Sequence, residues 1–258
     1  MSLPTPTCTL SPTPRSSHTS HITHHSLVMS SNKMEGRLPA SLSKLQHLRM
    51  VELATMPGLG GPLSKELCSV TTLRRLCICR CTLDSPIPDE IGNLVALEEL
   101  QLFGNRLSGY IPESLGNLHQ LKLLSLGEYT GGNNFEDAPI PDCIRHLVSL
   151  EALFLSSCNL VGRLPEWLGE LKELRQLDLQ NNSLQGGMCD GALVGLDQLL
   201  YLNVKDNPML GYREALPVKL LSRLAKLNRL SFVNTGLTHT EAQLDELQER
   251  LPRCKIWS

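Results

Sequence analysis

The chain has 258 residues, a formal net charge of −2 at pH 7 and 41% hydrophobic residues. This balance offers no excess of basic side chains to nucleic acid or an anionic membrane surface, so we expect no nucleic-acid partner. No run approaches the roughly 18 consecutive apolar residues that a spanning helix needs, so we expect no membrane span in this chain.

Residues 1–25 are rich in Ser, Thr, Pro and His and lack the continuous apolar stretch of a signal peptide. Such a composition cannot bury enough apolar surface to fold, so it predicts a disordered tail. Imidazoles could in principle bind Zn or Cu, and four lie here: His18, His21, His24 and His25. No Cys or carboxylate is placed to complete a tetrahedral shell, so we favour a flexible segment over a metal site.

From residue 26 onward a leucine-led pattern recurs at intervals of 24 to 29 residues, after a partial first copy. Its first position falls at Leu45, Val70, Leu94, Leu118, Leu147, Leu171, Leu196 and Leu224. A complete copy contains Leu94, Leu97, Leu100, Leu102, Asn105 and Leu107. One unit is too small to bury its own apolar face, so stability must come from stacking units into a continuous core.

This L-x-x-L-x-L-x-x-N/C-x-L spacing resembles the leucine-rich repeat family. The half-unit that follows Asn105 contains Leu107, Gly109, Ile111 and Pro112, and so resembles the plant-type repeat with its L-x-G-x-I-P segment. The resemblance implies an α/β solenoid: a right-handed superhelix bent into a horseshoe arc, with a concave parallel β-sheet and about eight to nine repeats. We therefore expect a solenoid domain over residues 26–258, preceded by the tail at 1–25.

The position after each predicted strand is often Asn or Cys, whose side chain can bond backbone groups in the turn. These residues are Cys81, Asn105, Cys158, Asn182 and Asn207. The pattern explains both cysteines by structure rather than by reactivity.

Two units are longer than the rest. The unit that begins at Leu118 has 29 residues, and we interpret Glu128–Asn134 as a loop insertion at one rim. The unit that begins at Leu196 has 28 residues. The sequence of residues 213–227 predicts an outer helix, in which Pro217 is tolerated only in the first turn.

Residues 238–257 predict a C-terminal cap. A capping box from Thr238 to Glu241 would open a helix, and a strand would follow it. This ending is similar to the intracellular-type closure of leucine-rich repeat arrays.

The nine cysteines are an odd number, so at least one thiol lacks an intramolecular partner. Secreted plant-type repeat proteins usually carry a cysteine pair before the array and another after it, and neither pair is present. Only one N-x-S/T sequon occurs, at Asn181–Ser183. These features favour a reducing compartment, so we expect a cytoplasmic protein. The alternative, an extracellular or membrane-associated location, follows if the N-terminus is truncated.

The sequence contains no phosphate-binding loop, no kinase motif, no G-x-S-x-G and no H-E-x-x-H. Cys77, Cys79 and Cys81 form the one cluster that could hold a metal. The facing positions on neighbouring strands are poor zinc ligands, and they are Glu52, Ala54, Gln101 and Phe103. We therefore expect no catalytic residues, no metal and no cofactor.

Function is assigned instead to strand residues that point away from the core. They combine aromatic, charged and amide side chains, as interface centres do. The predicted partner-binding residues are Glu52, Arg75, Glu99, Gln101, Phe103, Phe154, Gln176, Asp178, Tyr201, Lys205 and Arg229.

We interpret the chain as a monomeric, non-catalytic scaffold or recognition module that binds another protein or a peptide on this concave face. The alternative is an ectodomain fragment of a leucine-rich repeat receptor-like kinase, a receptor protein or a secreted inhibitor, acting in ligand perception and signalling. The missing cysteine caps favour the first interpretation, and the repeat subtype favours the second.

Overall fold

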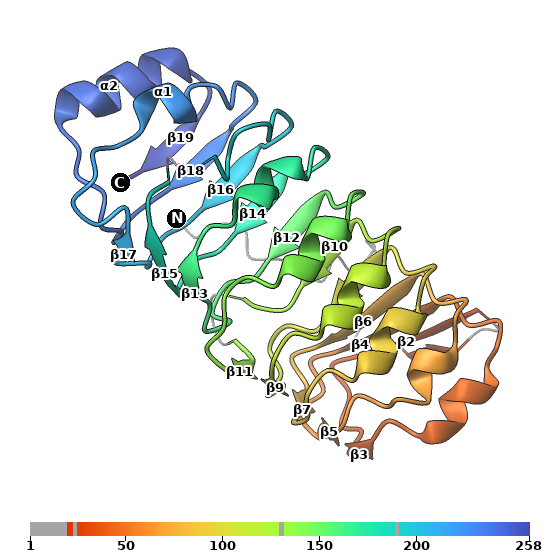
Figure 1. Cartoon of the computed structure of the whole chain (residues 1–258). Helices are drawn as coiled ribbons and strands as arrows, with labels where there is room; N and C mark the ends of the chain where they lie inside the picture. Colours follow the sequence, from red (N-terminus) through yellow and green to blue (C-terminus); the bar gives the residue numbers. More distant parts are fainter. Residues whose placement is uncertain (1–19, 23–24, 129–131, 189–190) are drawn as a thin grey trace.

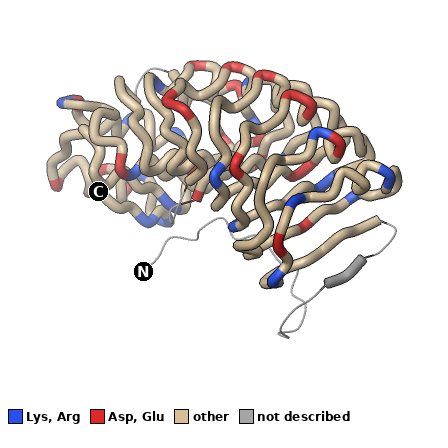
Figure 2. Tube along the Cα trace, turned by 90° about the horizontal axis from the view of Figure 1, so that it is seen from below, with Lys and Arg blue, Asp and Glu red and all other residues tan. Residues whose placement is uncertain are grey.

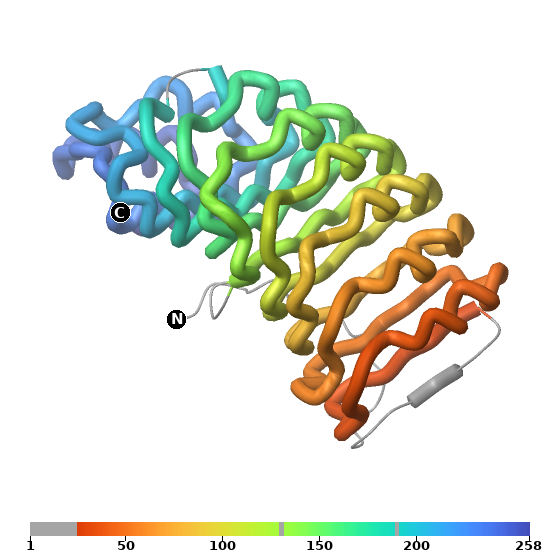
Figure 3. Tube along the Cα trace, turned by 60° about the horizontal axis from the view of Figure 1, so that its bottom comes forward, coloured from red at the N-terminus to blue at the C-terminus, as the bar shows by residue number. Residues whose placement is uncertain are grey.

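The computed structural model describes residues 20–22, 25–128, 132–188 and 191–258. They form a curved solenoid in which each unit contributes an inner strand and an outer segment, and most units add a short helix (Figures 1 and 3). The predicted α/β solenoid with a parallel inner sheet is confirmed. Acidic and basic residues both occur along the whole array (Figure 2), in keeping with the nearly neutral charge.

The inner sheet has 11 strands, and all its neighbours are parallel except the first pair. Each strand is short because the leucine pattern alternates inward and outward for only a few residues before the turn. In spatial order the strands are β1 (Ser20–Ile22), β2 (Ser26–Ser30), β4 (Met50–Ala54), β6 (Arg75–Cys79), β8 (Glu99–Gln101), β10 (Leu123–Ser125), β12 (Ala152–Phe154), β14 (Gln176–Asp178), β16 (Tyr201–Asn203), β18 (Arg229–Ser231) and β19 (Lys255–Trp257).

The first strand lies within the segment predicted to be a tail. β1 pairs antiparallel with β2, with Ser20 opposite Met29. Of the histidine cluster, His18 and His24 lie outside the described residues. The predicted domain boundary at residue 25 therefore stays a prediction, although β1, which precedes it, already pairs with the sheet.

The outer face carries shorter strands in three small sheets. They are β3 (Gly36–Arg37), β5 (Leu59–Gly61) and β7 (Thr82–Leu83); β9 (Ser108–Gly109) and β11 (Asn134–Phe135); and β13 (Val161–Arg163), β15 (Ser183–Gly186) and β17 (Met209–Leu210). A 3₁₀ helix follows in six units, in most of them directly after the Pro of the Ile-Pro or Leu-Pro pair. These helices are η1 (Ala40–Lys44), η2 (Leu67–Ser69), η3 (Asp89–Asn93), η4 (Glu113–Asn117), η5 (Asp142–His146) and η6 (Glu166–Glu170).

The C-terminal end differs from the prediction in two details. The outer helix α1 spans only Val218–Leu221, because Pro217 lacks an N–H and the residues before it are extended, with Ala215 bridging to Thr238. The helix α2 (Glu241–Arg250) begins two residues later than expected, since its capping box joins Thr240 to Gln243. Helix α2 and strand β19 lie at this end of the array (Figure 1), and their assignment as an intracellular-type cap stays a prediction.

Buried asparagines connect successive turns as the sequence predicted. Asn105 Nδ2 donates to the carbonyls of Ile78 (2.7 Å) and Leu102 (2.9 Å), and its Oδ1 accepts from the N–H of Leu83. Asn182 and Asn207 make equivalent bonds. Each side chain thus satisfies buried backbone groups of two units at once.

Asn133 occupies the same position in the long unit, although the sequence assigned it to the insertion. Its Nδ2 donates to the carbonyls of Leu126 (2.7 Å) and Leu102 (3.1 Å). The five extra residues of this unit therefore divide into four before Asn133 and one after it. The single extra residue lies on the outer side, between Phe135 and Ile140.

Candidate binding surface on the concave sheet

The strand register places every predicted partner-binding residue in one of three rows across the inner sheet. The first row contains Met50, Arg75, Glu99, Leu123, Ala152, Gln176, Tyr201 and Arg229. The middle row contains Glu52, Cys77, Gln101, Ser125, Phe154, Asp178, Asn203 and Ser231. The third row lies where the strands end, and includes Cys79, Phe103, Gln180 and Lys205.

The middle and third rows are more buried than expected. Phe103 is 1% and Phe154 6% exposed, and Tyr201 in the first row is 7% exposed, so these aromatics are not the exposed contacts that the sequence predicted. Glu52, Gln101 and Asp178 are also buried. The reason is packing of neighbouring side chains on the sheet, as in the separate apolar cluster of Cys77, Cys79 and Phe103.

The accessible positions among the predicted residues lie mainly in the first row. Gln176 and Arg229 are exposed, and the side chains of Arg75 and Glu99 are each 25% exposed. Lys205 in the third row is half-buried, with Nζ 3.6 Å from Asp206 Oδ2. A partner that docks without rearrangement of the sheet therefore meets the first row.

An ion pair joins the third row to the long unit. Arg80 Nη2 donates to Glu128 Oε2 at 2.8 Å, and the Arg80 guanidinium lies 5.8 Å from the centroid of the Phe103 ring. The Glu128 side chain is only 4% exposed, whereas that of Arg80 is 48% exposed. Sequence reasoning missed both residues, because they are 48 positions apart and neither occupies a strand position.

The other half of the sheet has a polar network around Asp178. Its carboxylate accepts from the Tyr201 hydroxyl (2.8 Å), from Asn203 Nδ2 (3.2 Å) and from the backbone N–H of Gln180 (3.1 Å). Burial raises the pKa of Asp178 above its usual value, and the three donors oppose that shift only in part. Burial also raises the pKa of Tyr201, with the nearby Asp178 charge adding to the effect.

A ladder of alternating charge runs along the edge of the sheet beside the first row. Glu98 accepts from Arg74 and Lys122, each at 2.8 Å, and Arg175 lies 3.6 Å from Glu151. Within the first row, Arg75 Nη2 donates to Glu99 Oε1 at 2.6 Å. The carboxylates on this side of the molecule are therefore neutralised by basic neighbours one unit away.

The cysteines of the described residues are all buried. Burial raises the pKa of Cys68 and Cys143 to about 12 and that of Cys254 to about 11. Thiols that stay protonated are poor nucleophiles and resist oxidation, so they are compatible with a reducing or an oxidising compartment. Across the described ranges, no group of three or more His, Cys, Asp or Glu residues is arranged to hold a metal ion.

Comparison with known proteins places this geometry among ligand-binding repeat arrays. Residues 24–194 match the family model described as a leucine-rich repeat region. The chain is 32% identical over 124 residues to receptor-like protein 47 of Arabidopsis thaliana, which corresponds to 47% of this chain and 15% of that protein. The chain thus spans only a small part of the curated relatives it matches.

Two solved structures are similar over most of the chain. The plant peptide hormone receptor RGFR1, in complex with RGF2, superposes with a TM-score of 0.75 at 28% identity, covering 87% of this chain and 34% of the receptor. The ectodomain of the Arabidopsis receptor kinase HAESA, in complex with an IDA peptide hormone ligand extended at its N-terminus, gives a TM-score of 0.64 at 26% identity, covering 83% of this chain and 42% of the receptor chain. The similar structures are ligand-binding ectodomains, which supports a protein or peptide partner.

The cytoplasmic location expected from the sequence is wrong, because these similarities contradict it. Receptor-like protein 47, RGFR1 and HAESA are receptor-type proteins, whose repeat ectodomains face the outside of the cell. The cysteine pattern misled because buried thiols of raised pKa carry no information on the redox state of the compartment. In the part of the chain that the structure describes, no helix has the length and apolar character to span a membrane.

Proposed function

This chain belongs to the leucine-rich repeat family, and from that premise we propose that it is part of a receptor ectodomain that perceives an extended peptide. The receptors RGFR1 and HAESA, which it resembles, bind the peptide hormones RGF2 and IDA. The receptor interpretation therefore replaces the scaffold as the main hypothesis. It places the chain in the extracellular space.

The observation that carries this proposal is the chemistry of the first row, whose polar members are accessible while Ala152 and Tyr201 are buried. Charged and amide side chains lie toward its two ends, with Arg75 and Glu99 on one side and Gln176 and Arg229 on the other. Leu123 and Ala152 lie between them. From β6 to β18 the row crosses six strand intervals, or roughly 29 Å at about 4.8 Å each, which an extended peptide of about nine residues would span.

The row predicts the kind of peptide that fits. Polar or charged side chains would lie near both ends, where Arg75, Glu99, Gln176 and Arg229 can pair with them, and apolar side chains near the middle. The buried middle row beside it would keep this face of the sheet rigid, which lowers the entropic cost of binding.

The test is selection from a random nine-residue peptide library displayed on mRNA, spiked with synthetic RGF2 and IDA, against the chain purified from a secreting eukaryotic host. We expect peptides with polar ends and an apolar centre to be enriched. The double variant Gln176→Ala with Arg229→Ala should lose at least tenfold in affinity for them, measured by isothermal titration calorimetry.

The matched control removes the same residue types from the outer side, as Gln185→Ala with Arg106→Ala, since both residues are exposed there. The control should bind as the unmodified chain does. If no peptide is enriched, or if both double variants bind equally well, the concave first row is not the binding surface.

A further inference from the structure

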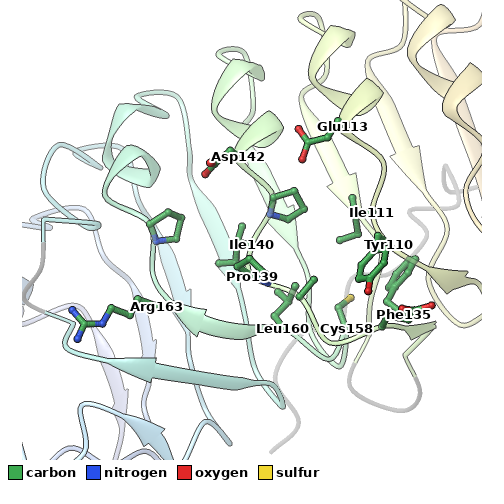
Figure 4. Close-up of a pocket in the computed structure, with 14 residues that line it drawn as sticks. Tyr110, Ile111, Glu113, Phe135, Pro139, Ile140, Asp142, Cys158, Leu160 and Arg163 are labelled. Carbon is green, nitrogen blue, oxygen red and sulfur yellow. The ribbon is translucent and has the colours of Figure 1, made fainter.

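The outer face of the long unit contains a hollow of about 490 Å³, within the range of roughly 300–1,000 Å³ typical of ligand clefts. We call this cavity the outer hollow. Its apolar lining includes Ile111, Phe135, Pro139, Ile140 and Leu160, and the Tyr110 ring forms one of its walls (Figure 4). It lies on the opposite side of the solenoid from the concave rows. An inference about it therefore does not rest on the proposed function.

The repeat is irregular at this hollow. Phe135 and Ile140 are five positions apart, whereas Leu107 and Ile111, the equivalent residues of the preceding unit, are four apart. The extra residue interrupts the outer strands: β11 pairs with β9, and the next unit is reached only through the single bridge from Ala138 to Leu160. The apolar floor residues Ile111, Phe135, Ile140 and Leu160 are themselves only 2–7% exposed, so the accessible apolar surface of the hollow comes mainly from Tyr110 and Pro139.

Three exposed carboxylates surround this apolar floor: Glu113, Glu136 and Asp142. Glu113 and Asp142 begin the 3₁₀ helices η4 and η5 on one side of the hollow (Figure 4). Glu136 hydrogen-bonds the hydroxyl of Tyr110, which holds the ring as a wall and raises its pKa. No ion pair to any of the three occurs among the described residues, in contrast with the paired Glu98, Glu99 and Glu151 of the inner edge.

The one basic residue of the lining does not neutralise these carboxylates. Arg163 belongs to β13, and its aliphatic stem passes over Gly186 of β15, where a Cβ would lie 2.9 Å from Arg163 Cγ. Its guanidinium extends away from Glu113 and Asp142 (Figure 4). The hollow therefore combines an apolar floor with a net negative rim.

A neighbouring hollow of about 690 Å³ also has Tyr110 in its lining. It is built from the corresponding outer positions of earlier units, including Leu63, Pro86 and Ile87. Tyr110 is 59% exposed and stands between the two. An extended chain could therefore continue across this ring, whereas a compact small molecule would occupy only one side.

We propose that the outer hollow docks a segment of a protein partner that carries Lys or Arg beside an aliphatic residue or proline. The apolar side chain packs in the hollow against the exposed Tyr110 ring and Pro139, and the cation lies among Glu113, Glu136 and Asp142. Opposite charge across the contact selects this segment over an acidic one. The surface gives the chain a second binding face, independent of the concave sheet.

The test uses the same displayed nine-residue library, compared between the unmodified chain and the double variant Glu113→Gln with Glu136→Gln. Peptides that the variant fails to retain should be enriched in Lys or Arg next to Leu, Ile or Pro, and should bind the variant at least tenfold more weakly. Asp142 is left in place because it accepts a hydrogen bond from Trp167 Nε1 at 2.7 Å.

The matched control is Glu166→Gln with Glu173→Gln, which removes two exposed carboxylates outside the hollow. Glu166 begins η6 as Glu113 begins η4, so the control tests the position in the repeat as well as the charge. The control should retain the basic peptides, and so should the concave variant Gln176→Ala with Arg229→Ala.

Three results would overturn the proposal. The lost peptides could show no excess of Lys or Arg, or no peptides could be lost at all. Alternatively, sedimentation could show self-association that Tyr110→Ala abolishes, which would make a second copy of this chain the occupant. If no selected peptide depends on Gln176 and Arg229, the receptor hypothesis is contradicted and this proposal is unaffected.

Discussion

The two halves of the concave sheet bury their middle and third rows by different chemistry. Around β6 and β8, Cys77, Cys79 and Phe103 form an apolar cluster next to the Arg80–Glu128 ion pair. Around β14 and β16, Asp178 is instead surrounded by hydrogen-bond donors. The backbone register is the same in both halves, so the repeat fixes where side chains go and leaves open how their burial is stabilised.

The largest effect is expected in the apolar half, from Phe103→Ala. Removing a fully buried phenyl ring leaves a cavity and loses its transfer free energy, so the free energy of unfolding should fall by about 3 kcal/mol. Urea denaturation of the purified chain measures this as a lower midpoint at unchanged slope.

Gln176→Ala is the control for this substitution, since it alters an exposed residue of the same sheet and should stay within about 0.5 kcal/mol. If Phe103→Ala lowers the free energy of unfolding by less than about 1 kcal/mol, the ring is solvated and the two halves of the sheet differ less than the structure indicates.

In the polar half, Tyr201→Phe should lower the free energy of unfolding by about 1–2 kcal/mol, less than Phe103→Ala does. The substitution removes one donor to the buried Asp178 carboxylate while Asn203 and the Gln180 N–H remain. Thermal unfolding can be compared with Tyr212→Phe, which alters a tyrosine that is 52% exposed and should have almost no effect. Equal melting temperatures for the two variants would mean that the network contributes nothing.

Asp178→Asn tests the same half through pH. The folded-state pKa of Asp178 is raised above the usual value of 3.8, so its contribution to stability is present below that value and is lost as pH rises through the folded pKa. The Asp178→Asn variant has no carboxyl group at this position, so it does not lose this stability as pH rises. Its stability relative to the unmodified chain should therefore increase as pH rises from about 3.8, then level off.

Melting curves of both proteins across this range measure the difference. Asn keeps an acceptor for Tyr201, so we expect the net change in stability at neutral pH to be smaller than that of Tyr201→Phe. A difference that does not vary with pH would show that Asp178 is solvated, in conflict with its 1% exposure.

The solenoid could be predicted from the sequence because its determinants are local and repeated. Leu100 and Leu102 recur at equivalent places in each unit, and the register of the inner strands follows from them. Asn133 was missed because four extra residues separate it from the leucines that mark its position. The helix at 213–227 was predicted too long because Pro217 limits it more strongly than the apolar pattern extends it.

The binding surface was only partly predictable. The period of two along each strand correctly separates the rows from the core, but it does not tell which row stays accessible, because that depends on side chains from neighbouring units. Phe103 was expected to be exposed and is buried against Cys77 and Cys79. The ion pair of Arg80 with Glu128 depends on a contact between distant units, which spacing alone does not encode.

The smallest effect is expected in the first row, in the Arg75–Glu99 pair. Both side chains are 25% exposed, so solvent screens the pair and a double-mutant cycle with Arg75→Ala and Glu99→Ala should give a coupling of about 0.5 kcal/mol. A coupling above about 2 kcal/mol would place this pair with the buried rows. A small coupling energy means that Arg75 and Glu99 can break their ion pair and bind a ligand instead at little cost in free energy, as a binding row requires.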